Sequence, residues 1–257
     1  MDWPLLIEFV RQRAPAFLAQ LEGVPDASIW ALAADRGAAL PASYVEFLRR
    51  MGSHCSGWAP FGATLDHHFA AIVERLDAED EDAPPSDRFF PVAIETDESL
   101  VALYDHYLDL QRVEGDDAPL VMLEAGVPYQ WQTPIETHET FNERVTFSLF
   151  HRFQLRLCAE RDVVTLGGTL RAGEGRAGLQ QALVLLQRAG FEPALPLLGR
   201  TACLRAGTLS VLARVNENHE LLTLLLGSDN RLSLKALADQ LLAGLPGARR
   251  PSGPFVG

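Results

Sequence analysis

Hydrophobic positions near the start of the chain recur at helical spacing. Between residues 5 and 21 the apolar side chains fall near one face of a helix, which Pro15 would kink or divide in two. A second helix is expected to end at Gly37, with Asp26 or Ser28 as its N-terminal cap. The pattern therefore predicts that the chain opens with short amphipathic helices.

The clearest helix of the sequence begins at Leu40-Pro41 and ends at Gly52. Pro41 suits a first helical turn, where its missing N–H is no loss, and Gly52 favours a left-handed stop. Apolar side chains follow at positions i, i+3, i+4 and i+7, which predicts a buried stripe. The stripe consists of Tyr44, Phe47, Leu48 and Met51.

Short apolar runs replace this helical pattern in the middle of the chain. Residues 89–94, 120–123 and 129–133 are expected to be strands joined by turns. Residues 100–108 fit either a helix or a strand. Thr140-Phe-Asn-Glu143 is a capping box, which predicts the start of a long helix.

The last third of the chain repeats the alternation of helix and strands. Five glycines between Gly167 and Gly178 predict a linker. The segments after it are expected to be a helix over 179–189, strands over 195–204, 208–216 and 219–226, and a helix over 232–242. Residues 246–257 are rich in Gly, Pro and Arg, which is typical of a flexible tail.

These patterns together predict an α+β protein with two modules. N-terminal helices would pack on a small antiparallel sheet, and a smaller α-β-β-β-α module would follow. The expected boundaries are 1–165 for the first domain, 166–178 for the linker, 179–245 for the second module and 246–257 for the tail.

Charge divides the chain at a similar place. Residues 1–165 contain 12 Lys/Arg and 28 Asp/Glu, whereas residues 166–257 contain 10 and 6. The acidic part would repel nucleic acid and anionic membranes and favour a basic partner. No apolar run approaches the roughly 18 residues of a membrane helix, and Met1-Asp2-Trp3-Pro4 is unlike a secretory signal. Three cysteines without metal-type spacing indicate a reducing compartment, so we expect a cytoplasmic protein without a cofactor.

The string Leu40-Pro41-x-x-Tyr44-x-x-Phe47-Leu48-x-x-x-Gly52 resembles the SUKH superfamily. This superfamily includes bacterial immunity proteins and the yeast cell-wall-assembly regulator. The resemblance covers roughly residues 25–155, with Thr140-Phe141 in the place of the pair near the family's closing helix. The chain departs from the family at residues 95–99, which replace its usual Gly-Asp turn, and the last 90 residues have no counterpart in it.

The resemblance implies a cytoplasmic protein with a SUKH-like first domain and no catalytic residues. Such a protein would neutralise the toxin of a polymorphic toxin system by direct contact, and the acidic surface suggests that the toxin is basic. Two alternatives stay open: a regulatory or scaffold protein that inhibits nothing, and a hydrolase that uses the loop from Trp58 to His68.

The candidate chemistry in that loop is Asp66-His67-His68, with His54-Cys55 nearby in sequence. Adjacent histidines point about 100° apart on a helix and to opposite faces of a strand, so no metal site is expected. An activated thiol needs electropositive surroundings, which the acidic half does not offer to Cys55. The glycine pairs after residue 166 match neither GxGxxG nor a P-loop, and the acidic runs lack EF-hand spacing.

The remaining candidates are residues that would contact a partner protein. Carboxylates are concentrated between residues 74 and 117, and Trp side chains are frequent anchors of interfaces. The expected contact residues are Glu79, Asp80, Glu81, Asp82, Asp97, Glu98, Asp105, Asp109, Asp116, Asp117, Trp58 and Trp131.

Overall fold

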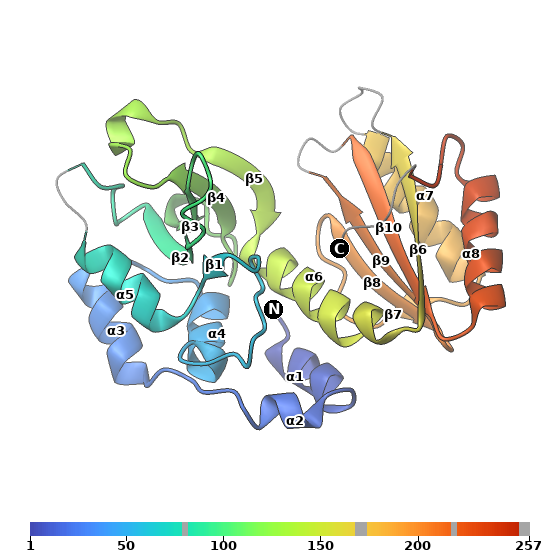
Figure 1. Ribbon diagram of the computed structural model, residues 1–257, viewed down its shortest axis with the longest axis horizontal. Helices are drawn as coiled ribbons and strands as arrows, with labels where there is room; N and C mark the ends of the chain where they lie inside the picture. The colour runs from blue at the N-terminus through green and yellow to red at the C-terminus, as the bar shows by residue number, and fades with distance from the viewer. Residues whose placement is uncertain (79–81, 168–173, 217–219, 252–257) are drawn as a thin grey trace. The chain divides into compact units, whose positions relative to one another are not determined.

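The computed structural model describes residues 1–78, 82–167, 174–216 and 220–251. The described chain is mixed α+β with two antiparallel sheets, as the sequence predicts (Figure 1). It divides into two compact units, which consist mainly of residues 14–145 and 146–257. Residues Met1 and Trp3 belong to the first unit, and Asp2 and 4–13 to the second.

The first unit contains a five-stranded antiparallel sheet in the order β1-β2-β3-β4-β5. Its helices precede and interrupt the strands, and α5 contacts β2 (Figure 1). The elements are α2 (Pro15–Leu18), α3 (Asp26–Asp35), α4 (Ala42–Met51), β1 (Leu65–Asp66), α5 (Phe69–Asp77), β2 (Phe89–Glu95), β3 (Tyr104–Asp109), η1 (Leu110–Arg112), β4 (Pro119–Glu124), η2 (Tyr129–Trp131) and β5 (Ile135–Thr140).

The predicted stripe of α4 is buried. Phe47 is 0% exposed, and its ring lies 5.5 Å from that of Phe141 and 6.3 Å from that of Trp58. Tyr44 packs edge-on against Phe90 of β2. The α4 helix therefore covers the sheet through aromatic side chains, as its spacing predicts.

Two expectations about this region need correction or completion. Residues 129–133 are not a strand: Pro128 precedes a short 3-10 helix there, and the strand follows at residues 135–140. That strand turns the polar side chains of Thr137 and Glu139 inward, so it shows no apolar pattern. The sequence leaves open whether residues 100–108 form a helix or a strand. Residues 104–109 form the strand β3.

The capping box is confirmed at the start of α6 (Phe141–Phe153). Glu143 accepts a hydrogen bond from the Thr140 amide at 3.1 Å, and the Glu143 amide donates to Thr140 Oγ1 at 3.3 Å.

Near the N-terminus, Pro15 begins α2 after α1 (Trp3–Arg11) has ended, so the predicted first helix is divided in two.

The second unit contains a five-stranded antiparallel sheet in the order β6-β10-β9-β8-β7. The expected α-β-β-β-α order is present, with two further strands at the edges of the sheet. The elements are η3 (Leu155–Leu157), β6 (Glu160–Gly167), α7 (Glu174–Arg188), β7 (Glu192–Pro193), β8 (Thr201–Ala206), β9 (Leu209–Val215), β10 (Leu221–Ser228) and α8 (Arg231–Gly244).

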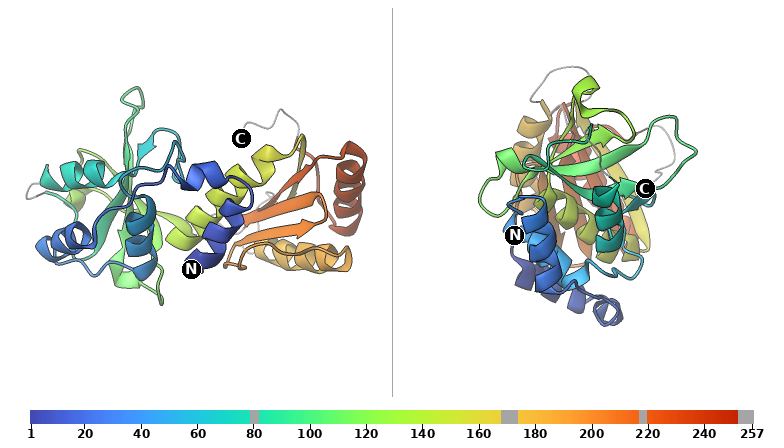
Figure 2. Two further views of the ribbon diagram at one scale, coloured as in Figure 1. Left: turned by 90° about the horizontal axis from the view of Figure 1, so that it is seen from below. Right: turned by 90° about the vertical axis from the view of Figure 1, so that its left-hand side faces the viewer.

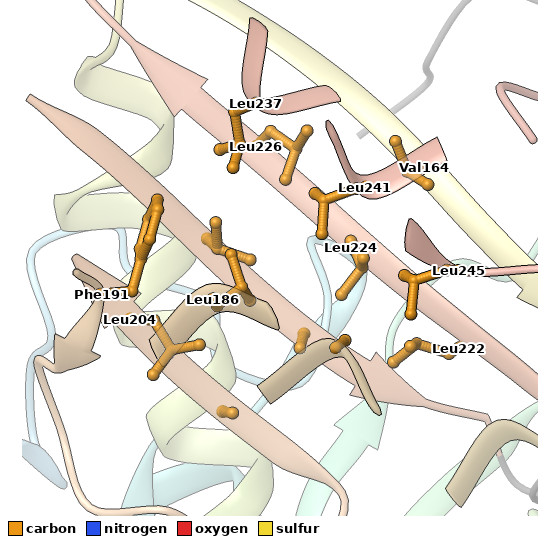
Figure 3. Close-up of a cluster of buried hydrophobic side chains, with 14 of the residues drawn as sticks. Val164, Leu186, Phe191, Leu204, Leu222, Leu224, Leu226, Leu237, Leu241 and Leu245 are labelled. Atoms are coloured by element: carbon orange, nitrogen blue, oxygen red, sulfur yellow. The ribbon is translucent and has the colours of Figure 1, made fainter. Parts of the chain in front are cut away.

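The core of the second unit lies between this sheet and the helices α7 and α8, which can be followed in Figures 1 and 2. Leu222, Leu224 and Leu226 alternate along β10 and face the helices, as Figure 3 shows. Residues of the opposite parity, such as Gly227, face Leu155 and Cys158 at η3. Both faces of β10 are therefore covered, which explains its nearly continuous apolar sequence.

The structure places the division between modules earlier than the sequence suggests. The expected boundary at residue 165 falls inside β6, which pairs with β10 from Gly167 to Glu160. Residues 174–178 of the expected linker belong to α7, and its centre, residues 168–173, lies outside the described residues. Arg249 in the expected tail exchanges backbone hydrogen bonds with Thr165 at 2.8 and 2.9 Å, so that part of the tail is ordered.

Candidate functional site

The two tryptophans proposed as partner contacts lie in opposite environments. Trp58 is 2% exposed and packs against Phe17 and Phe47, so it is a core residue and not an interface anchor. Trp131, at the end of η2, is 76% exposed. Only Trp131 of this pair presents a large apolar surface to a partner.

Two of the proposed carboxylates are internal ion-pair partners. Asp105 is 1% exposed and accepts a hydrogen bond from Arg75 Nε at 3.0 Å. Asp109 is equally buried and lies 3.3 Å from Arg88 Nη2 and 2.8 Å from Arg112 Nε. These carboxylates bind the protein's own arginines, which corrects the expectation that they contact a partner.

Asp116 and Asp117 also have structural partners. Asp116 accepts from Ser43 Oγ at 2.8 Å and pairs with the amino group of Met1. Asp117 accepts from the Asn142 amide at 3.0 Å in the first turn of α6, and burial raises the pKa of its carboxyl. Both carboxylates tie the turn before β4 to neighbouring helices. Their oxygen atoms are therefore less available to a partner protein.

The remaining proposed carboxylates lie nearer the surface. Asp82 and Glu98 are exposed, and Asp97 is half-buried in the turn between β2 and β3. Hydrogen bonds from Ser99 to the Asp97 carboxylate hold the pKa of Asp97 below its usual value. Glu79, Asp80 and Glu81 lie outside the described residues.

A cleft of about 270 Å³ in the first unit lies next to the segment that contains η2. Pro128 and Gln132, on either side of η2, both line it. Its charged lining residues are Asp82, Glu124 and Arg75, and Arg75 is already paired with Asp105. The cleft therefore has two carboxylates in its lining and lies next to the segment that carries the exposed Trp131.

Hydrogen bonds fix the segment that carries Trp131. The Tyr129 amide donates to the Asp82 carbonyl at 2.9 Å, and Gln130 Nε2 donates to the Asp82 carboxylate at 3.2 Å. The Gln132 side chain accepts from the Glu124 amide at 2.7 Å and donates to the Val127 carbonyl at 2.8 Å. Trp131 is thus presented on a braced loop.

A second cluster forms where the loop after α4 meets the start of α5. The Cys55 Sγ atom lies 3.1 Å from His67 Nε2 and 3.5 Å from His68 Nε2. The Nδ1 atom of His68 lies 2.6 Å from an Asp66 carboxylate oxygen. The two imidazole rings stack with centroids 4.9 Å apart, so both ring edges reach the same sulfur. The expectation that these adjacent histidines point apart is wrong.

Local backbone geometry explains this convergence. Ser56 and Gly57 adopt left-handed φ angles of 49° and 67°, which form a tight turn that directs Cys55 inward. His67 follows β1, and His68 is the N-cap residue of α5 with an extended backbone. Since neither histidine is inside the helix or the strand, the helical and strand angles between neighbours do not apply.

Burial shapes the chemistry of this cluster. Burial, together with the nearby His68 ring, lowers the pKa of His67 to about 4, so its imidazole is neutral at pH 7. Burial pushes the pKa of Asp66 upward, but its hydrogen bonds with His68 outweigh this effect and hold the pKa below its usual value. The cluster is therefore a neutral imidazole, a thiol, and a second imidazole oriented by a carboxylate.

The contacts from Asp66 to His68 and from His68 to Cys55 resemble a catalytic arrangement, in which a carboxylate orients a histidine base beside a cysteine nucleophile. However, Cys55 is 1% exposed, and its thiol donates to the Trp58 carbonyl at 2.8 Å. A substrate has no direct access to a sulfur atom buried in this way. The Cys55 sulfur is therefore poorly placed to attack a substrate.

None of the helices in the described part of the chain is both long and apolar enough to cross a membrane. No protein-family model matches the chain, and a search among curated proteins finds no match.

Proposed function

We propose that this protein binds another protein through Trp131 and the adjoining acidic cleft, and that it neutralises a basic toxin in this way. The observation that carries the proposal is the exposed Trp131 on a segment whose neighbouring residues line a cleft that also contains Asp82 and Glu124. Tryptophan is enriched at the energetic centres of interfaces, and its exposure to water is otherwise unfavourable.

The shape and charge of the cleft indicate the kind of group that would enter it. A long cationic side chain of the partner could lie in the cleft between Asp82 and Glu124 while its neighbours cover Trp131. The excess of acidic residues over residues 1–165 would speed the encounter with a basic partner. The hydrogen bonds that brace η2 reduce the conformational entropy lost on binding.

The inhibitory role is supported by the resemblance to the SUKH superfamily. The helix that contains the string from Leu40 to Gly52 is followed by an antiparallel sheet and then by a helix that begins at Phe141, in the order that the resemblance implies. An immunity protein needs a rigid recognition surface and no reactive group. The surface formed by Trp131 and the neighbouring cleft, called the Trp131 surface below, meets this description.

Co-expression with the products of neighbouring genes tests the function. We expect one product to kill cells when expressed alone, to be harmless when this protein is present, and to co-purify with it. A partner that co-purifies with unchanged activity would favour the scaffold alternative. If no toxic product is neutralised and none co-purifies, the proposed function is wrong.

A further inference from the structure

Cys55, His67 and His68 present three ligand atoms to one point. One ligand atom from each of the three residues lies within 4.8 Å of the other two. A tetrahedral Zn²⁺ ion, with bonds of about 2.3 Å to sulfur and about 2.0–2.1 Å to nitrogen, holds such ligands roughly 3.6 Å apart. The sulfur–nitrogen distances of 3.1 and 3.5 Å are close to this value.

The other nitrogen of each ring has a partner of its own. His67 Nδ1 lies 3.5 Å from the Leu65 carbonyl, and His68 Nδ1 lies 2.6 Å from the Asp66 carboxylate. Asp66 is in turn held by the His68 amide at 2.9 Å. Histidines that bind metals typically donate Nδ1–H to a carbonyl or a carboxylate, which leaves the Nε2 lone pair to the metal. Both histidines have such a partner at Nδ1, and the Nε2 atom of each points towards Cys55.

We propose that Cys55, His67 and His68 form a binding site for Zn²⁺. One thiolate and two imidazoles suit Zn²⁺, whereas Ca²⁺ and Mg²⁺ require oxygen ligands. Three protein ligands leave the fourth tetrahedral position to water. The half-exposed side chains of His68 and Asp66 give the ion a route from solvent.

Binding would replace the thiol proton. The Cys55 S–H bond breaks, the thiolate forms the bond to Zn²⁺, and the proton passes to solvent. The ion would then tie the loop after α4 to the N-terminal end of α5. Because this site is built from different residues than the Trp131 surface and needs no partner protein, it stands or falls independently of the proposed function.

Titration of the full-length chain with Co²⁺ and Zn²⁺, after treatment with a chelator, tests the site. We expect one Co²⁺ per chain, with the near-ultraviolet charge-transfer absorption of a cobalt–thiolate bond, and displacement of Co²⁺ by Zn²⁺. Cys55→Ser should remove this absorption. Asp66→Asn retains an acceptor oxygen at a half-exposed position, so it should fold normally and bind the metal about 10–100-fold more weakly.

The matched control is His138→Asn. His138 is an exposed histidine of the first unit whose left-handed φ of 53° suits Asn, so this variant should bind metal as the unmodified chain does. His67→Gln and His68→Gln should each weaken binding more than Asp66→Asn does. The proposal is overturned if the unmodified chain gives no thiolate band. It is also overturned if the band survives in Cys55→Ser, or if Asp66→Asn and His138→Asn have equal affinities.

Discussion

Phe47→Ala is expected to lower the free energy of unfolding by about 3–5 kcal/mol, the usual cost of removing a fully buried aromatic ring. Phe47 has no exposed surface, and its ring contacts Tyr44, Trp58 and Phe141. Alanine would leave a cavity between α4 and the start of α6 that these large rings cannot fill. Urea denaturation followed by circular dichroism measures the loss.

A change at an exposed apolar position provides the control. Leu100 is half-exposed in the turn between β2 and β3, so Leu100→Ala should cost less than about 1 kcal/mol. If Phe47→Ala costs as little as Leu100→Ala, the α4 stripe is not buried, and the packing of helix against sheet described above is incorrect.

Arg75→Met is expected to destabilise the protein by about 3 kcal/mol, because it leaves the buried Asp105 carboxylate without its cation. Arg75 donates to Asp105 and, through Nη2, to the Tyr107 hydroxyl at 3.1 Å. Asp105 also accepts a hydrogen bond from the Glu95 backbone amide at 3.0 Å, which carries no charge. The matched control is Arg88→Met, because Asp109 keeps its contact with Arg112, and its cost should be below about 1 kcal/mol.

The pH dependence of Arg75→Met provides a second test. Burial raises the pKa of Asp105 even with Arg75 in place, so removal of Arg75 should raise this pKa further. The folded variant then binds a proton more readily than its unfolded chain, and its stability relative to the parent should increase as the pH falls from 7 towards 4. A destabilisation that is independent of pH, or equal for both arginine variants, would show that the ion pair is not its cause.

Local patterns in the sequence predict much of the fold. The spacing of Tyr44, Phe47, Leu48 and Met51, the Thr140–Glu143 capping box and the α-β-β-β-α order of the second unit are all present. Each depends on neighbours within about one turn of helix or a few residues of strand. Strand β5 has no apolar pattern because its inward side chains are polar: Thr137 Oγ1 donates to the Leu120 carbonyl at 2.6 Å, and Glu139 pairs with Arg144.

The candidate sites depend on contacts that sequence spacing does not encode. Asp105 belongs with Arg75, thirty positions away on another element, so a count of acidic residues could not identify it as internal. Cys55 meets His67 and His68 only because of the turn at Ser56 and Gly57 and the position of His68 before α5. Trp58 and Trp131 are indistinguishable by residue type, and tertiary packing alone separates the buried indole from the exposed one.

The most direct test of the proposed function is the dissociation constant of the complex with the neutralised toxin, measured for the unmodified protein, Trp131→Ala and Trp30→Ala. Trp30, on α3, is also an exposed tryptophan of the first unit, which makes it the matched control. Trp131 is 76% exposed and Trp30 49% exposed, so neither change should lower the unfolding midpoint much.

If Trp131 is a central anchor, its removal should cost about 2 kcal/mol or more, which is roughly a 30-fold weaker complex. Trp30→Ala should bind within about threefold of the unmodified protein, because a contact outside the interface contributes little. Equal dissociation constants for the unmodified protein and Trp131→Ala would contradict the assignment of this surface as the binding site.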